Sequence, residues 1–459
     1  MTLPSCLSGL RDDLEVQIIR GLEFLLERSE RHSDYGFVDM KVKVLDGRDF
    51  DRDSSGALHV YHRDVIYGFA QGRAIESLAG HIRWLSEASL LPTRERERLK
   101  NRAKAVLVRT IEALEHHRDL HGGRVFFMAL STGGALCVDR AGHVRPWQPP
   151  PGRTLTEIFY FKGLLAAASV LEDRSLLGLA DTLFQSIACD ALAGKIVNDC
   201  QPMDPKNPVE AVPGRISQAD RMLCLGGVSL GIEAGLPGYR ELGACLFRSL
   251  IAGHLNLGQF EGLERGDFVE YVDESGRPWK DAAGRIWCDP GHAIEFIGLA
   301  TKFLLAMRSA GLSGECPFSS SIGRFAEGHF GKLLGHFWEM GFNPDSGGIC
   351  KSVDLVTRTP INRDMPWWSL PEGLRASVEV LVISHEEEAP LLCDMALQCH
   401  RAYSDHYVRR DFHCLPIQTR DGHGVVKDVI PAIPDADPLY HTGLSLIDVL
   451  RLLPKPPSH

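Results

Sequence analysis

Apolar residues recur every three or four positions through most of the chain, the spacing that gives an α-helix one buried face. Polar stretches interrupt this pattern and divide it into about a dozen segments. These segments cover residues 14–29, 65–88, 96–117, 157–173, 176–194, 222–235, 239–255, 292–311, 321–341, 370–385, 387–408 and 440–453. The pattern therefore predicts a protein made almost entirely of amphipathic helices.

Between helix pairs the chain carries a recurring polar insert. Each insert has a glycine, a short stretch of β-formers, and a turn built on Asp and Gly, which supply the positive φ angles of hairpin turns. Five inserts are clear and a sixth is weaker; they cover residues 34–53, 122–147, 266–281, 347–364, 411–428 and, for the weaker one, 203–220. A unit that recurs in this way indicates a repeat architecture.

Six units of two helices and a hairpin, closed into a ring, would form an all-α (α/α)6 barrel with its hairpin loops on one face. We expect a single catalytic domain over residues 1–459, with a core from about residue 14 to residue 453. An open helical solenoid that serves for binding is the alternative. Because the hairpins are large and are followed directly by His, Trp and Glu, a closed barrel with a polar pocket at the loop face is favoured.

Composition and charge narrow the classes of partner. The 459 residues are 44% hydrophobic and 24% charged, with a formal net charge of −10, so no nucleic-acid partner is expected. No apolar run reaches the roughly 18 residues of a membrane span, and charged residues from Arg11 onward come too early for a secretory signal. The scattered cysteines form no CxxC pair and suit a reducing compartment. We expect a cytoplasmic protein.

The clearest candidate chemistry lies in RIWCDPGHAIEFIGL, where Pro290 and Gly291 interrupt the chain just before a helical pattern begins. His292 and Glu295 then fall at the start of that helix, three residues apart and on one face. A histidine beside a carboxylate suits acid–base catalysis, because imidazole titrates near neutral pH. A helix cap with no catalytic function would use the same residue types.

A second histidine, His441, holds a similar place in PLYHTGLSLIDVL, at the start of the last helix. In a closed ring this helix would lie across the barrel mouth from the helix that bears His292. Two histidines on one cavity can remove a proton from one face of a carbon atom and return a proton to the other. The alternative is a hydrogen-bonded histidine with a purely structural function.

Two other helix starts carry polar or aromatic candidates. Trp367 and Trp368 precede a helix whose first turns hold Glu372, and we expect one Trp to fill core and the other to stack on a sugar ring. Arg73 and Glu76 lie on one face of the segment 65–88. An inward Arg73 would stabilise an enediolate oxygen, whereas a surface ion pair with Glu76 is the alternative.

Taken in order, these motifs resemble the N-acylglucosamine 2-epimerase superfamily. That group includes N-acylglucosamine 2-epimerases, mannose isomerases and cellobiose 2-epimerases. The similarity rests on four stretches: EYVDESGRPW with PGHAIEF (270–296), GFNPDSGGICKSVD with WWSLPEGL (341–374), LYHTGLSLIDVL (439–450) and, more weakly, AQGRAIESL (70–78).

The resemblance implies an (α/α)6 barrel that moves protons at C1 and C2 of an aldose without a metal. It places the catalytic groups at four positions: His292, His441, Glu295 and Arg73. We expect four further residues to contact the substrate, namely Trp367, Trp368, Glu372 and Glu76.

One stretch departs from the family pattern. Members usually carry a further histidine in a motif similar to MHLLEA on the third inner helix. The matching stretch here reads DRMLCLGGVSLGIEA, with Leu223 or Cys224 at the histidine position and Gly226 or Gly227 at the acidic position. The resemblance therefore does not indicate which residues of this helix would contact a substrate.

We therefore expect a sugar isomerase or 2-epimerase that works through a cis-enediolate. Its carbohydrate substrate would be a mannose- or glucose-type aldose, an N-acylglucosamine, or the reducing end of a β-1,4-disaccharide. No nucleotide, nicotinamide or metal motif is seen, so we expect activity with no cofactor and no metal. A homodimer is the default oligomer.

Two other functions stay open on the same scaffold. A glycoside hydrolase or lyase would need carboxylates at set separations, and four acidic residues could compete for that role: Asp273, Asp289, Glu295 and Glu372. A non-catalytic sugar-binding protein is the second alternative. His117 and His121 are four residues apart but have no third ligand spaced nearby, so a solvated helix end is favoured there over a metal site.

Overall fold

The computed structural model describes most of the chain. The described residues are 3–32, 34–50, 60–139, 141, 143–201, 212–312, 317–428 and 435–454. Residues 203–211 of the weak insert predicted at 203–220 lie outside them, and its second half is described. Among the helices in these ranges, none combines the length and the apolar character that a bilayer-crossing segment needs.

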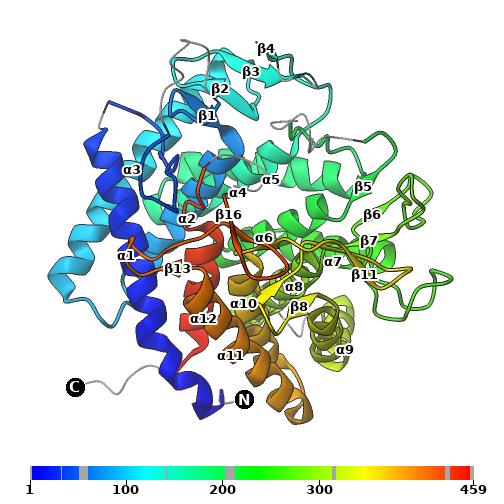
Figure 1. Ribbon diagram of the computed structural model, residues 1–459. Helices are drawn as coiled ribbons and strands as arrows, with labels where there is room; N and C mark the ends of the chain where they lie inside the picture. The colour runs from blue at the N-terminus through cyan, green and yellow to red at the C-terminus, as the bar shows by residue number, and fades with distance from the viewer. Residues whose placement is uncertain are drawn as a thin grey trace.

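Twelve α-helices in the described ranges form two concentric rings (Figure 1). The inner ring contains α2 (Gly68–Trp84), α4 (Leu155–Leu171), α6 (Ala219–Glu233), α8 (Pro290–Ser309), α10 (Ser369–Ile383) and α12 (Ser445–Leu452). The outer ring contains α1 (Arg11–Arg31), α3 (Thr93–Leu120), α5 (Arg174–Leu192), α7 (Tyr239–His254), α9 (Pro317–Gly341) and α11 (Ala389–His406). Each inner helix contacts the next, and α12 contacts both α10 and α2. The predicted (α/α)6 barrel is thus confirmed.

Burial explains which helices lie inside. In α4 every residue from Thr156 to Ala168 is buried, because the helix is covered on all sides. In α3 the buried residues recur at helical spacing, at Leu99, Ala103, Val106 and Thr110 among others, so that helix has one covered face. An all-round apolar helix belongs in the interior of a large protein and an amphipathic one at its surface.

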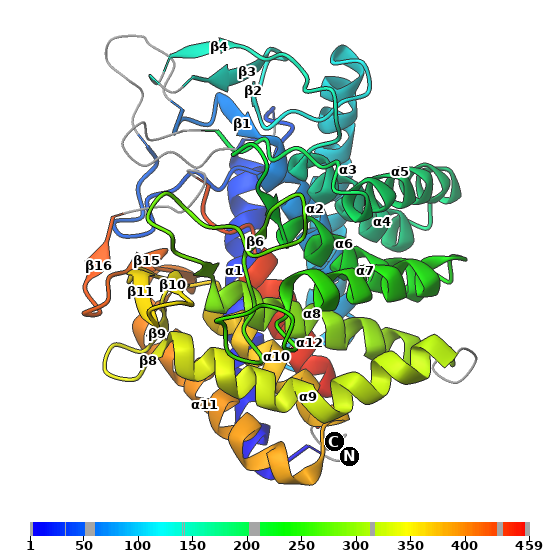
Figure 2. The same cartoon turned by 90° about the vertical axis from the view of Figure 1, so that its right-hand side faces the viewer.

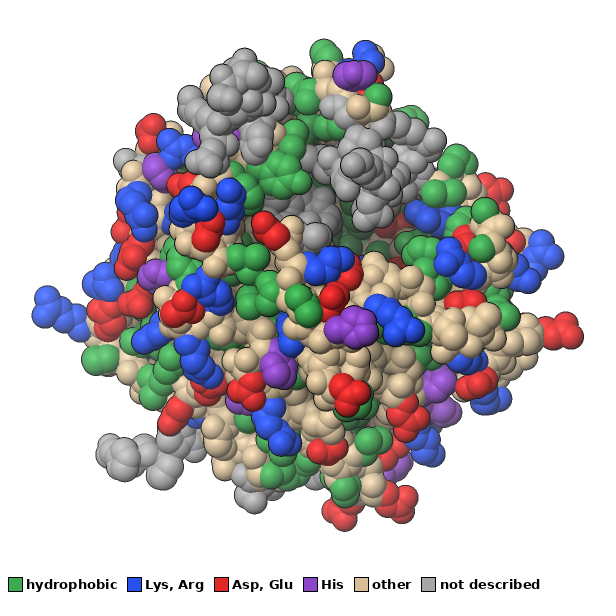
Figure 3. Space-filling model, in the orientation of Figure 1, with side chains coloured by type: hydrophobic (Ala, Val, Ile, Leu, Met, Phe, Trp, Pro, Cys, Tyr) green, Lys and Arg blue, Asp and Glu red, His purple; other side chains and the backbone are tan. Residues whose placement is uncertain are grey.

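The strands gather at one end of the barrel, as Figure 2 shows on its left side. They are β1 (Val65–Tyr67), β2 (Met128–Leu130), β3 (Ala135–Val138), β4 (Val144–Pro146), β5 (Ile216–Ser217), β6 (Tyr271–Val272), β7 (Trp287–Cys288), β8 (Phe342–Asn343), β9 (Gly348–Ile349), β10 (Ser352–Asp354), β11 (Thr359–Asn362), β12 (Met365–Pro366), β13 (Val408–Arg409), β14 (Leu415–Pro416), β15 (Thr419–Arg420) and β16 (Val426–Lys427). Acidic and basic side chains are interspersed over this face (Figure 3).

Antiparallel pairing joins neighbouring inserts. Strand β10 pairs with β11 in its own hairpin and with β7 from the preceding insert, while β12 pairs with β15 from the following one. The insert predicted at 34–53 forms, within its described part, only an isolated bridge between Val42 and Asp49. Because β7 and β12 lead directly into α8 and α10, these sheets fix where the inner helices begin.

The contact between α2 and α4 gives a test of this packing. A Cβ added at Gly72 would lie 2.7 Å from the backbone of Phe159 and Tyr160, so Gly72→Ala should force the helices apart and cost about 2 kcal/mol or more of unfolding free energy. Gly178 in α5 has no atom within 4 Å of such a Cβ, so Gly178→Ala should be neutral or stabilising by up to about 1 kcal/mol. Denaturant unfolding measures both; equal behaviour of the two variants would contradict the close approach of α2 and α4.

Candidate active site

The start of α8 positions the first histidine. Asp289 caps the helix by accepting a hydrogen bond from the backbone N–H of His292, and Pro290 occupies the first helical position. The imidazole Nδ1 of His292 lies 2.9 Å from Glu270 Oε1 and 3.3 Å from Asp289 Oδ2. Since a carboxylate only accepts hydrogen bonds, Nδ1 carries the proton and Nε2 is directed elsewhere.

Electrostatics keep His292 protonated. Burial alone would lower the pKa of His292, but the carboxylates of Asp289 and Glu270 outweigh it and raise the pKa to about 9. The ammonium of Lys351 opposes this in part, because its Nζ lies 2.6 Å from Asp289 Oδ2. His292 is therefore an imidazolium at neutral pH and can donate a proton.

Trp368 joins the two predicted histidines. Its ring centroid is 5.1 Å from that of His292, in a stacked arrangement, and 5.5 Å from that of His441. Gly291 allows this close packing, because a Cβ there would lie 2.8 Å from the Trp368 ring. Trp367 and Trp368 both belong to the hydrophobic core, where one core residue and one sugar-stacking residue had been predicted. The two rings predicted to face one pocket are thus separated by a single indole.

The last inner helix begins with an irregular turn that positions His441. Leu439 adopts a left-handed conformation, with φ +62°, and a π-helical segment from Tyr440 to Leu444 follows. Asp437 Oδ1 accepts the backbone N–H of Tyr440 at 3.1 Å. Non-glycine residues with positive φ and π-helical turns are both concentrated at functional sites. His441 Nδ1 is 2.8 Å from Glu372 Oε1, so its Nε2 is also free of that carboxylate.

Glu372 is a fully buried carboxylate with several partners. Oε1 accepts hydrogen bonds from His441 and from Ser445, the latter at 2.8 Å, and Oε2 pairs with Arg375. Burial alone would raise the pKa of Glu372, but Arg375 and the hydrogen bond from His441 lower it to about 2. Glu372 therefore stays ionised and orients the imidazole of His441.

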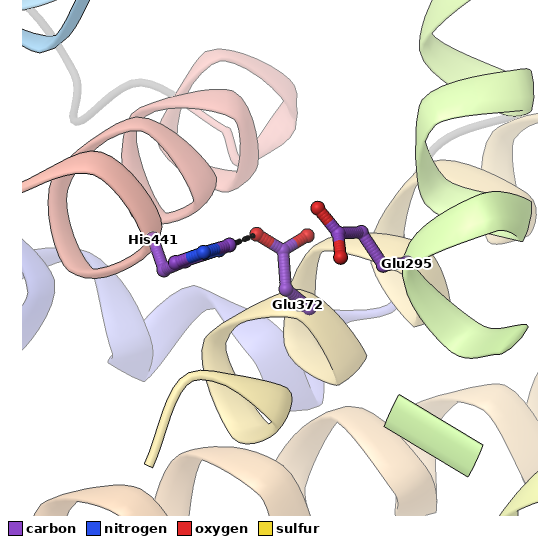
Figure 4. A group of neighbouring side chains, drawn as sticks. All are labelled: Glu295, Glu372 and His441. Atoms are coloured by element: carbon purple, nitrogen blue, oxygen red, sulfur yellow. Dashed lines mark hydrogen bonds and ion pairs between the residues drawn. The ribbon is translucent and has the colours of Figure 1, made fainter. Parts of the chain in front are cut away.

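Glu295 faces this group from α8 and points at the carboxylate of Glu372 (Figure 4). Burial and the neighbouring carboxylate of Glu372 raise the pKa of Glu295, because two negative charges this close repel each other. The ligand atoms of Glu295, Glu372 and His441 lie within 4.8 Å of one another, and in the described part of the chain no other such group is found. Arg375 already pairs with this cluster, and its guanidinium would repel a divalent cation there.

Arg73 points inward, but it does not pair with Glu76. Its guanidinium carbon lies 4.1 Å from the ring centroid of Phe69, 4.5 Å from that of Phe159 and 5.1 Å from that of Tyr440. Within the described residues no carboxylate pairs with Arg73, and its Nε has no hydrogen-bond partner. Glu76 instead pairs with Lys162, at 3.1 Å. This half-buried guanidinium contacts aromatic faces and, among the described residues, no carboxylate, so it is able to receive a negatively charged oxygen.

Several site groups were not predicted from the sequence. Glu270 and Asp289 hold His292, whereas Glu295 from the same helix turn points at Glu372. Asp289 was recognisable as an N-cap, because it directly precedes a proline at the first helical position. Arg375 and Lys162 are charged residues within apolar segments, and such residues are almost never buried without a partner.

Of the alternative candidates, Asp273 and His117 lie away from this site, whereas the other three carboxylates are part of it. Asp273 is in a hairpin turn, where it accepts hydrogen bonds from Ser275 and Arg277. His117 is buried and contacts the rings of Phe37 and Phe126. The solvated helix end predicted around residue 117 is therefore wrong for that side chain, because the first insert covers it.

Known proteins resemble this chain in fold and not in sequence. No family model matches the sequence, and no curated protein matches it. Among solved structures, a D-mannose isomerase superposes with a TM-score of 0.60 at 14% identity, over 94% of this chain and 97% of the other. A cellobiose 2-epimerase from Spirochaeta thermophila gives 0.63 at 16% identity, over 98% and 99%. A possible member of the GH105 family from Salmonella enterica gives 0.51 at 12% identity, over 96% and 94%. The chain therefore has the barrel of sugar isomerases and epimerases, which other carbohydrate enzymes share.

The raised pKa of His292 predicts a pH dependence of stability. A group whose folded pKa of about 9 exceeds its ordinary value of 6.5 stabilises the fold below the lower value, and this stabilisation is lost as pH rises through the higher one. The stability difference between wild type and His292→Gln should therefore be larger at pH 6 than at pH 10. Urea unfolding at both pH values measures it; an equal difference at both would contradict the ion pairs with Glu270 and Asp289.

Proposed function

We propose that this chain is a sugar 2-epimerase or aldose–ketose isomerase that works through a cis-enediolate. The observation that carries the proposal is the arrangement of two imidazoles on one indole, each with Nδ1 on a carboxylate: His292 on Glu270 and His441 on Glu372. Because Nδ1 of each ring contacts a carboxylate, the other ring nitrogen, Nε2, can face the substrate. The two Nε2 atoms then act on one substrate carbon. The fold shared with sugar isomerases and epimerases supports it.

The two histidines have different charge environments and so different roles. His292 contacts two carboxylates, whereas His441 shares its one carboxylate with Arg375 and Ser445. His441 therefore removes the C2 proton of the open-chain aldose, and the imidazolium of His292 supplies a proton. Delivery to the opposite face of C2 gives the epimer, and delivery to C1 gives the ketose.

Charge on the enediolate is stabilised by Arg73 and Glu295. The guanidinium of Arg73, which pairs with no carboxylate among the described residues, donates to one enediolate oxygen. A preorganised donor of this kind contributes much of the rate enhancement in such reactions. Glu295, with its raised pKa, holds a proton that can pass between O1 and O2. Trp368 holds the two imidazoles apart, so we assign it a positioning function in addition to contact with the sugar.

A glycoside hydrolase is the second candidate, because Glu295 and Glu372 are close and their pKa values shift in opposite directions. Such a pair is typical of an acid and a nucleophile. However, both oxygens of Glu372 already have partners in Arg375, His441 and Ser445. This makes Glu372 an orienting group and a poor nucleophile, which favours the isomerase proposal.

Deuterium exchange tests the proposal directly. The protein is incubated in D2O and EDTA with aldoses, N-acylglucosamine and β-1,4-disaccharides, and the products are analysed by NMR. Deuterium at C2 of an epimer or at C1 of a ketose is expected. Cleavage of the disaccharide would favour the hydrolase instead, and no exchange with any sugar would favour a binding protein.

Substitution of the histidines should separate catalysis from folding. His292→Ala and His441→Ala should each lower kcat by about 10³-fold, because each removes a proton-transfer group, while circular dichroism stays helical. His329→Ala on the exposed face of α9 is the matched control, with unchanged kcat. Full activity in either site variant would refute the assignment of that histidine.

A further inference from the structure

A lysine lies inside the barrel, beside the proposed site. Lys162 belongs to α4, and its side chain is only 1% exposed. A buried ammonium is costly unless it is paired and hydrogen-bonded. Its Nζ lies 3.1 Å from Glu76 Oε2 and donates a hydrogen bond to the hydroxyl oxygen of Tyr440. Lys162 therefore connects three inner elements: α2, α4 and the segment that bears His441.

The neighbouring helix α6 leaves room for this side chain. A Cβ at Gly226 would lie 3.4 Å from Lys162 Nζ, and one at Gly227 would lie 3.0 Å from Lys162 Cγ. Side chains at these two positions would press on the lysine and, more closely still, on Leu299 and Phe184. The glycines in the segment that departs from the family pattern thus admit a cation to the barrel interior.

Tyr440 passes the effect of Lys162 to the site. Its ring lies 4.9 Å from that of His441 and 5.1 Å from the guanidinium carbon of Arg73. An ammonium can only donate, so the phenol oxygen of Tyr440 accepts and its own hydrogen must point elsewhere. Within the described residues no acceptor for that hydrogen is found. Burial raises the pKa of Tyr440, so the hydrogen stays in place at neutral pH.

We propose that Lys162 is a positioning residue that fixes the hydroxyl of Tyr440 as a hydrogen-bond donor to the enediolate, next to Arg73. Two donors on one developing negative charge stabilise it more than either does alone. This inference rests on the proposed isomerase or epimerase function and adds Tyr440 to the groups that touch the reacting atoms.

A mutant cycle tests it on an accepted sugar. Lys162→Met and Tyr440→Phe should each lower kcat by about 10²-fold, with KM changed less than about threefold because the donor acts on the enediolate. The double variant should be no worse than the poorer single variant, since Lys162 acts through Tyr440. Each single variant should also bind an aldonohydroxamate, an analogue of the enediolate, about 10²-fold more weakly, which a merely structural role would not produce.

Arg11→Met is the matched control, because Arg11 is a buried cation of α1 that holds backbone carbonyls at the far end of α12. It should lower the thermal midpoint and leave kcat unchanged. If Lys162→Met does not fold, the variant Lys162→Met with Glu76→Gln is used in its place, because it removes both charges of the buried pair.

Full kcat in the lysine variant would overturn the positioning role of Lys162, and so would losses that multiply when Lys162→Met is combined with Tyr440→Phe. Neither result affects the proposed function. A wild-type protein that exchanges no C2 proton would overturn the proposed function as well.

Discussion

The contact of Glu372 with His441, Ser445 and Arg375 is the interaction on which the site most depends. It joins α10 to the last inner helix, and that helix closes the ring against α2. If the carboxylate were neutral or absent, the guanidinium of Arg375 would be left buried without its nearest partner, and His441 would lose the group that fixes its tautomer. Ring closure and the orientation of the proposed base are therefore parts of one interaction.

Glycine makes these buried charges compatible with a packed barrel. Gly298 on α8 faces Arg375, where a Cβ would lie 3.2 Å from the guanidinium Nε, and Gly226 on α6 faces Lys162 in the same way. Each cation thus fills the space that a side chain on the adjacent inner helix would take. Interiors are close-packed, so a long charged residue can enter only where its neighbour gives up volume.

The two halves of the barrel mouth also differ in charge. His292 lies among Glu270, Asp289 and Lys351 near the surface, while His441 lies deeper, against a carboxylate already compensated by Arg375. The proposed acid and the proposed base are the same residue type, and they need such different surroundings to act at one pH. Both imidazoles contact the indole of Trp368, so these two surroundings lie on either side of one side chain.

The sequence by itself determined the helices, most of the hairpins and the positions of His292, His441 and Trp368 at the starts of inner helices, because periodicity, turn residues and N-caps act over a few neighbouring residues. Only the tertiary structure decided the partners of these side chains. His292 meets Glu270 across 22 residues of sequence, and Lys162 meets Tyr440 across 278. No local sequence pattern predicts either contact, because both form only when the ring closes and the buried charged groups pair with each other.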